Sequence, residues 1–143
     1  MASWSEVEAQ APELAARARG FFDARKHKTL ATLRRDGSPR ISGIEAEFAD
    51  GELRFGSMAR AVKALDLRRD PRFALHSGSD EPTDWKGDAK VAGFAREVES
   101  AGESHQFRAD IRELVVVYMG EPRDHIVVES WHEGRGVTLR RRY

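Results

Sequence analysis

Two Asp-Gly pairs near the start of the chain constrain its fold more than any other feature. Asp36-Gly37 and Asp50-Gly51 each separate stretches in which apolar and polar residues alternate. Such a pair is a strong signal for a tight turn between antiparallel strands, because glycine readily adopts the positive φ that these turns need. The sequence therefore predicts an antiparallel meander, with its three short strands at residues 29–33, 40–48 and 52–55.

The remaining segments add helices and further strands. Residues 5–25 predict one amphipathic helix, since apolar residues recur at helical spacing and Ser3 and Ser5 match a capping box. A short helix follows the third strand and ends before Asp70-Pro71, because a residue preceding proline avoids the helical region. Residues 107–118 suit a helix or a strand, and their β-branched run favours one strand of a long hairpin. Further strands are expected at residues 73–76, 90–98 and 125–131.

These elements predict a fold that is mainly β with peripheral helices. Six or seven adjacent antiparallel strands tend to close into a barrel, because closure removes exposed strand edges. The two helices are expected outside the barrel, one at the N-terminus and one after the third strand. A chain of 143 residues has room for a single core, so we expect one domain over residues 1–143.

Composition excludes several classes of function. The chain contains no cysteine, which excludes disulfide frameworks, thiolate catalysis and Cys-bound metal sites. It carries 24 Lys and Arg against 24 Asp and Glu, so no net field attracts nucleic acid. No apolar run approaches the roughly 20 residues of a membrane helix, and the N-terminus does not resemble a signal peptide. We therefore expect a cytoplasmic protein that binds neither nucleic acid nor membranes.

Residues with catalytic potential are sparse. The five histidines are scattered and match no metal-binding spacing, so no metal site is expected. Neither a phosphate-binding GxxxxGK[ST] loop nor a GxGxxG sequence is present. No side chain stands out as a catalytic acid or base. If the protein is an enzyme, a cofactor is expected to supply the chemistry.

The strongest local signal for a ligand lies at residues 55–63. Ser57 ends the third strand, and Arg60 and Lys63 follow at a spacing that places both cations on one face of a helix. A hydroxyl group, a helix N-terminus and two cations together suit a phosphate group. The same pattern also describes a solvated amphipathic helix, and the segment alone leaves both interpretations open.

Four segments carry a resemblance to a known family. Residues 30–39 read LATLRRDGSP, residues 63–73 read KALDLRRDPRF, residues 91–95 read VAGFA and residues 131–136 read WHEGRG. Their order and spacing resemble the split β-barrel family of pyridoxamine 5′-phosphate oxidase, over roughly residues 20–142. No single motif is specific, so the resemblance depends on the order of all four.

The resemblance implies a homodimer with two cofactor sites between the subunits. It implies FMN as the cofactor, with the deazaflavin F420 as the alternative and haem in some relatives. Lys63 would hold the cofactor phosphate, Ser57 would supply a hydroxyl contact, and Arg60 would compensate for the basic residue that the family often has before its lysine. Further contacts implied by the resemblance come from Arg40, Ser42, Gly43, Ile44 and Trp131, the last reaching the site from the partner subunit.

The chain departs from the family pattern at three places. Ala61-Val62 stands where an Arg or Ser often precedes the lysine, and Glu133 replaces a proline of the terminal motif. The substrate-binding Arg and His of the vitamin B6 oxidases have no counterpart near Arg140-Arg141. The expected function is therefore an oxidoreductase that transfers a hydride between bound FMN or F420 and a small organic substrate. The alternative is a flavin- or haem-binding carrier or sensor on the same barrel, without catalysis.

Overall fold

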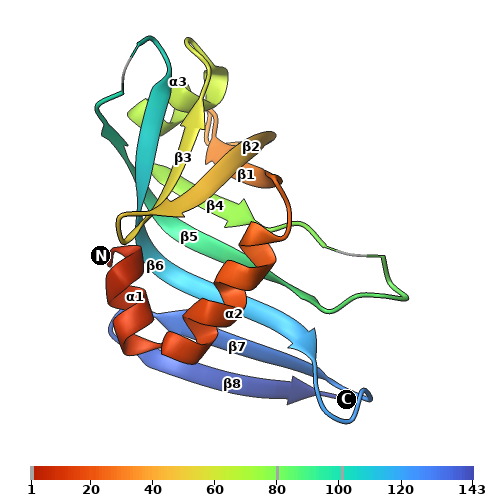
Figure 1. Ribbon diagram of the computed structural model, residues 1–143. Coiled ribbons are helices and arrows are strands. Elements are labelled where there is room, and N and C mark those ends of the chain that lie inside the picture. The colour runs from red at the N-terminus through yellow and green to blue at the C-terminus, as the bar shows by residue number, and fades with distance from the viewer. Residues whose placement is uncertain (1, 80, 101) are drawn as a thin grey trace.

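Eight antiparallel strands form one sheet that curls into a barrel in the computed structural model, which describes residues 2–79, 81–100 and 102–143 (Figure 1). The sheet order is β3-β2-β1-β4-β5-β6-β7-β8, and an additional pairing of β3 with β6 closes the first six strands into a ring. The expected antiparallel barrel is confirmed. The strands are β1 (His27–Leu33), β2 (Pro39–Ala49), β3 (Glu52–Ser57), β4 (Arg72–His76), β5 (Gly87–Val98), β6 (His105–Met119), β7 (Ile126–His132) and β8 (Gly136–Arg142).

The two Asp-Gly pairs make the turns of the β1–β2–β3 meander, as predicted. Gly37 and Gly51 have φ values of 86° and 74°, in the region that glycine reaches without a steric penalty. The carboxylate of Asp36 accepts a hydrogen bond from the Ser38 backbone N–H at 2.9 Å, which fixes the first turn. The register then pairs Leu30 with Ser42 across β1 and β2. This register sets which residues of β2 lie beside α3 (Val62–Arg69) and which face solvent.

The N-terminal segment forms two helices rather than the single predicted helix. The first is α1 (Trp4–Gln10), whose first turn is capped by the Ser3 hydroxyl, and the second is α2 (Pro12–Asp23). The prediction of one helix was wrong because Pro12 has no backbone N–H to continue α1 and instead occupies the first position of α2. Both helices bury an apolar face against the sheet, with Trp4, Leu14 and Phe22 at most 2% exposed.

Strand β6 connects the two parts of the sheet. Its first residues pair with β3 and its last residues with β7, while β5 lies along most of its length. The ambiguous stretch at residues 107–118 is thus a strand, as favoured. The register shifts between Ala92 and Gly93, and Gly93 passes so close to the β6 backbone that a Cβ would lie 2.0 Å from the Asp110 carbonyl oxygen.

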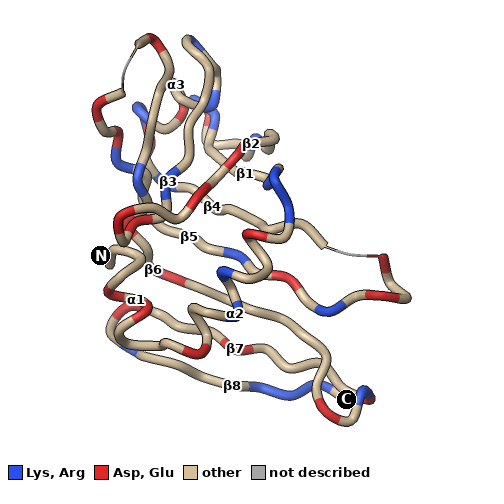
Figure 2. Tube along the Cα trace, viewed as in Figure 1, with Lys and Arg blue, Asp and Glu red and all other residues tan. Residues whose placement is uncertain are grey.

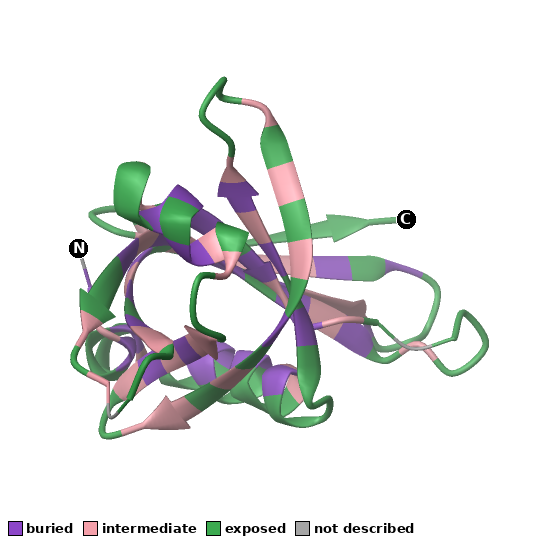
Figure 3. Cartoon of the chain, turned by 90° about the horizontal axis from the view of Figure 1, so that it is seen from above, coloured by how far each residue is buried: buried purple, intermediate pink, exposed green. Residues whose placement is uncertain are grey.

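Strands β7 and β8 extend the sheet beyond the closed ring. Strand β8 was not predicted, since almost all of its residues are exposed and Val137 and Leu139 are its only large apolar residues. Backbone pairing with β7 defines it, from His132 opposite Gly136 to Ile126 opposite Arg142. The exposed strand runs out from the ring toward the C-terminus in the end-on view of Figure 3. Among the described residues, no helix has the length and apolar character needed to cross a bilayer.

Candidate functional site

A cavity of about 840 Å³ opens against β2 and β3 next to the start of α3. Of the described residues that line it, five are Lys or Arg and three are Asp or Glu, which gives the cavity a cationic excess that the neutral chain lacks. Four predicted site residues lie in its wall: Gly43, Ile44, Ser57 and Lys63. The structure therefore brings half of the predicted set together in one cavity.

Lys63 lies at the edge of this cavity, at the second residue of α3. Its ammonium group donates a hydrogen bond to the backbone carbonyl of Gly43 on β2 at 2.6 Å. One carbonyl uses one of the three N–H donors of a lysine. The contact therefore holds the ammonium in place over β2 and leaves donors for an anion in the cavity.

Ser57 is the last residue of β3 and has a buried hydroxyl oxygen. That oxygen has no hydrogen-bond partner among the described residues, and the Ser42 hydroxyl is in the same state. Buried polar atoms are satisfied in the great majority of native structures, so an unpaired one beside a cavity indicates a place for a ligand or water. The nearby N-terminus of α3 begins after Ala61, which has no side chain to cap it. These groups supply hydrogen-bond donors close to the Lys63 end of the cavity.

The two glycines of the cavity wall differ in the space above them. Gly43 is exposed, and a Cβ built on it would meet no atom within 4 Å. On β3 a Cβ at Gly56 would lie 2.3 Å from the Gln106 side-chain amide, so Gln106 lies directly over this position. Ile44, next to Gly43, is 5% exposed and belongs to the core, although it also lines the cavity. The wall is thus open over Gly43 on β2, where a planar ring can approach, and is covered by Gln106 over Gly56 on β3.

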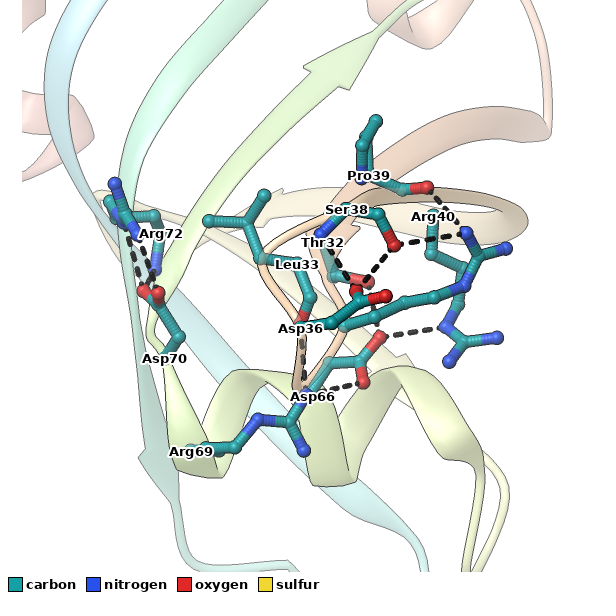
Figure 4. A network of polar contacts seen from close by, with 11 residues as sticks. Thr32, Leu33, Asp36, Ser38, Pro39, Arg40, Asp66, Arg69, Asp70 and Arg72 are labelled. Carbon is teal, nitrogen blue, oxygen red and sulfur yellow. Dashed lines mark hydrogen bonds and ion pairs between the residues drawn. The ribbon is translucent and has the colours of Figure 1, made fainter.

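Arg40 does not line this cavity, because its guanidinium binds Asp66 instead. Figure 4 shows the Asp66 carboxylate at the centre of a network in which Thr32 and Arg40 donate at 2.8 Å and Arg69 at 2.9 Å. Burial raises the pKa of Asp66, but the hydrogen bonds from Arg40, Thr32 and Arg69 outweigh it and the pKa falls below its usual value. The network fastens α3 to β1 and β2, so Arg40 acts on the Lys63 site through the position of the helix.

Arg60 lies outside α3, in the turn that precedes it. The expected helical face shared by Arg60 and Lys63 is therefore absent, because α3 begins at Val62. Arg60 has a φ of 62°, and its backbone N–H donates to the His105 imidazole at 3.3 Å. Its side chain is exposed and does not line the cavity.

Trp131 lies in the core of its own chain, 1% exposed. Its indole N–H donates to the Gln10 side chain at 3.0 Å, which joins β7 to α1. The structure therefore places Trp131 apart from the cavity. A reach into a partner's site would require the loss of both its burial and this hydrogen bond.

The basic run of residues 25–28 lines the cavity and was missed in the sequence. Arg25 and Lys26 lie between α2 and β1, His27 and Lys28 are the first two residues of β1, and all four lie in the wall. The sequence does show four consecutive basic residues here, but they follow the end of α2 and continue into β1, so they form no pattern within one helix or strand. Among the described residues, no group of three or more His, Asp or Glu side chains is arranged to hold a metal ion.

These features define a split β-barrel with a cavity of cationic excess beside its short helix α3. The sequence profile described as pyridoxamine 5′-phosphate oxidase matches residues 14–133. The chain therefore belongs to the pyridoxamine 5′-phosphate oxidase family, as its motifs indicated. No curated protein matches the chain.

Solved structures share the fold at low sequence identity. An FMN-binding, pyridoxamine 5′-phosphate oxidase-related protein from Nostoc punctiforme is 14% identical, with a TM-score of 0.64 and coverage of 100% of this chain and 98% of that one. PhzG from Burkholderia lata, in complex with tetrahydrophenazine-1-carboxylic acid, is 11% identical, with a TM-score of 0.68 and coverage of 96% and 91%. A haem-binding protein from Mycobacterium smegmatis is 15% identical, with a TM-score of 0.62 and coverage of 90% and 87%. At these identities the likeness concerns the fold alone.

Proposed function

We propose that the protein binds FMN in the cavity between β2, β3 and α3, with the cofactor phosphate at Lys63 and Ser57. The observation that carries this proposal is the Lys63 ammonium, held over β2 by the Gly43 carbonyl next to the unpaired hydroxyl of Ser57. A phosphate there accepts charge-assisted hydrogen bonds from the ammonium group and a further bond from the hydroxyl. The deazaflavin F420 also carries a phosphate and is the alternative cofactor.

The residues present fit a flavin-type cofactor at both ends. The donors at the start of α3 suit its phosphate, and the open space over Gly43 leaves room for a flat ring against β2. The ring of a bound flavin supplies the hydride chemistry. The protein orients the ring against the strand backbones and anchors the phosphate. On this basis the protein acts as an oxidoreductase that transfers a hydride between the cofactor and a small organic substrate.

The cavity is proposed to be completed by a second copy of the chain. Apolar side chains gather at its edge and along α3, where Ile41 is 73%, Met58 80%, Val62 52% and Leu65 48% exposed. Met58 also lines the cavity, so the apolar surface is continuous with the site. Exposed apolar surface of this kind favours a protein partner, and a homodimer would cover the open side of the bound ring.

Parallel titrations of the purified protein with FMN and F420 test the proposal. Binding of FMN is expected to quench its fluorescence, and Lys63→Ala is expected to weaken binding by about 1.5–3 kcal/mol, the scale of a hydrogen bond to a charged group. Lys90→Ala is the matched control, because Lys90 is exposed on β5 and does not line the cavity. Unchanged affinity in Lys63→Ala would remove this residue from the site. A Soret band after haem addition, with no binding of FMN or F420, would instead support the carrier function.

A further inference from the structure

The connection between α2 and β1, together with the first two residues of β1, brings several positive charges to the cavity. Residues 25–28 all line the wall, and Figure 2 shows the connection as a blue stretch between the two elements. Thr29, the next residue in β1, lies opposite Gly43, whose carbonyl holds Lys63. The basic run therefore lies at the start of β1, beside the β2 residues of the Lys63 site and displaced from Gly43 toward Glu45.

Lys28 is the buried member of this run. It is 6% exposed, and its ammonium group donates to the backbone carbonyls of Arg25 and of Lys26, the latter at 3.2 Å. Within the described part of the chain no carboxylate lies within ion-pairing distance of Lys28. Burial lowers the pKa of Lys28, and the more distant carboxylates of Asp23 and Glu45 oppose this shift. An ammonium has three donors, so one N–H remains beyond these two contacts.

Two exposed members of the run, Lys26 and His27, share a single carboxylate. Lys26 and His27 approach the same oxygen of Glu45, at 3.7 and 3.6 Å. The side chains of Lys26, His27 and Glu45 are 74%, 73% and 61% exposed, so solvent screens both contacts and they are weak. A ligand carboxylate can replace Glu45 as their partner at small cost. The carboxylate of Glu45 therefore holds Lys26 and His27 only weakly.

We propose that Lys28 binds a carboxylate group of the substrate, while Lys26 and His27 add positive charge at the exposed edge of the same cavity. This rests on the proposed function, in which the cofactor phosphate occupies the Lys63 end of the same cavity. A buried ammonium without a carboxylate partner gains most from an anion that enters the cavity, because it has already lost its hydration. The substrate class is then a small organic acid, with its carboxylate at the α2–β1 connection and its reacting carbon over β2.

Calorimetric titration with benzoate and benzamide tests the charge requirement, since the two probes differ little except in charge. The wild type, with and without added FMN, is expected to bind benzoate about tenfold more tightly than benzamide, the scale of a charge-assisted hydrogen bond. Lys28→Met is expected to abolish that preference and leave FMN affinity within about twofold of the wild type. Lys90→Met, on β5 outside the cavity lining, is expected to change neither affinity.

A second variant keeps the test independent of the buried contacts. Lys26→Met removes a largely exposed side chain and is expected to weaken benzoate binding about threefold, the smaller effect of a screened charge. Equal binding of benzoate and benzamide, or benzoate binding that neither variant changes, would overturn the proposal. A loss in Lys28→Met that is confined to F420, which carries carboxylates where FMN has none, would assign the carboxylate to the cofactor and also overturn it. The cofactor proposal fails separately, through FMN binding that Lys63→Ala leaves unchanged, because the benzoate titration also runs without FMN.

Discussion

Glu97, near the end of β5, has a carboxyl group with a strongly lowered pKa. The Arg68 guanidinium donates to both of its oxygens, at 2.7 and 2.9 Å, and the His105 imidazole lies 3.1 Å from one of them. The hydrogen bonds from Arg68 lower the pKa of Glu97 from 4.5 to about 2, against the opposing effect of burial. His105 in turn accepts a hydrogen bond from the Arg60 backbone N–H. Together these contacts join β5, β6 and α3 to the turn that precedes α3.

This shift predicts a loss of stability in acid. Because the pKa in the folded state is depressed, the contribution of Glu97 is full above about pH 4.5 and is lost as the pH falls toward about 2. Glu97→Gln is therefore expected to lower the free energy of unfolding at pH 6 by about 1 kcal/mol, since Arg68 is half exposed and screened. At pH 2 the carboxyl is about half protonated in the folded state, so the difference between the variant and the wild type should be clearly smaller than at pH 6. Urea unfolding at both pH values measures this.

The exposed Glu99 is the matched control for this experiment. It lies two residues further along the chain and makes no side-chain hydrogen bond or ion pair with another described residue. Glu99→Gln is expected to follow the wild type at both pH values. If Glu97→Gln were as stable as the wild type at pH 6, the Arg68 ion pair would contribute nothing to folding.

Individual side chains explain why only part of the site could be predicted. Lys63 and Ser57 follow a local pattern in one segment, and the cavity contains both. Arg40 and Trp131 are instead determined by partners far away in the sequence, Asp66 and Gln10. Lys28 was missed for another reason: strand alternation places it on the buried face of β1 with Leu30 and Thr32, although a lysine is rarely buried.

At the level of elements, turns and strands were predictable where backbone geometry decides them. The Asp-Gly turns required positive φ and fixed the meander, and the β-branched run of β6 made a strand as expected. Strand β8 was not predicted because backbone pairing with β7, rather than burial of one of its faces, holds it in place. The break between α1 and α2 depends on Pro12 alone, whose effect the continuous apolar periodicity obscured.

Two strand glycines provide a test of the cavity wall. A Cβ at Gly56 on β3 would meet only the flexible Gln106 amide, at 2.3 Å, so Gly56→Ala is expected to displace Gln106 within the cavity. We expect FMN affinity to fall about tenfold, or ~1.4 kcal/mol. The free energy of unfolding should change by less than about 1 kcal/mol, because backbone atoms need not move. Flavin fluorescence titration and urea unfolding measure the two effects.

Gly93→Ala is the control for Gly56→Ala. Its Cβ would lie 2.0 Å from a backbone oxygen of β6, which cannot rotate away, so it is expected to destabilise the fold by about 1–3 kcal/mol. Normal FMN binding by Gly56→Ala would show that the ring does not approach β3.

The whole molecule presents an apolar surface that a monomer leaves exposed. Ile41, Met58, Val62 and Leu65 lie around the cavity edge and α3, whereas the buried core lies inside the ring and under α1 and α2. The surface is formed by β2, the turn after β3 and α3, the elements that also carry the proposed phosphate contacts. Dimerisation and cofactor binding are therefore expected to depend on one another.

Ile41→Glu tests this dependence. Ile41 is 73% exposed, so the substitution leaves the core of each chain intact but places a charge in the proposed interface, where it loses hydration without gaining a partner. Sedimentation is expected to change from dimer to monomer, with unfolding unaltered, and FMN affinity is expected to fall at least about tenfold because one side of the ring is then open to water. Ile41→Val keeps the apolar contact and should remain dimeric. A monomeric Ile41→Glu protein that binds FMN as tightly as the wild type would separate the two properties and confine the cofactor site to a single chain.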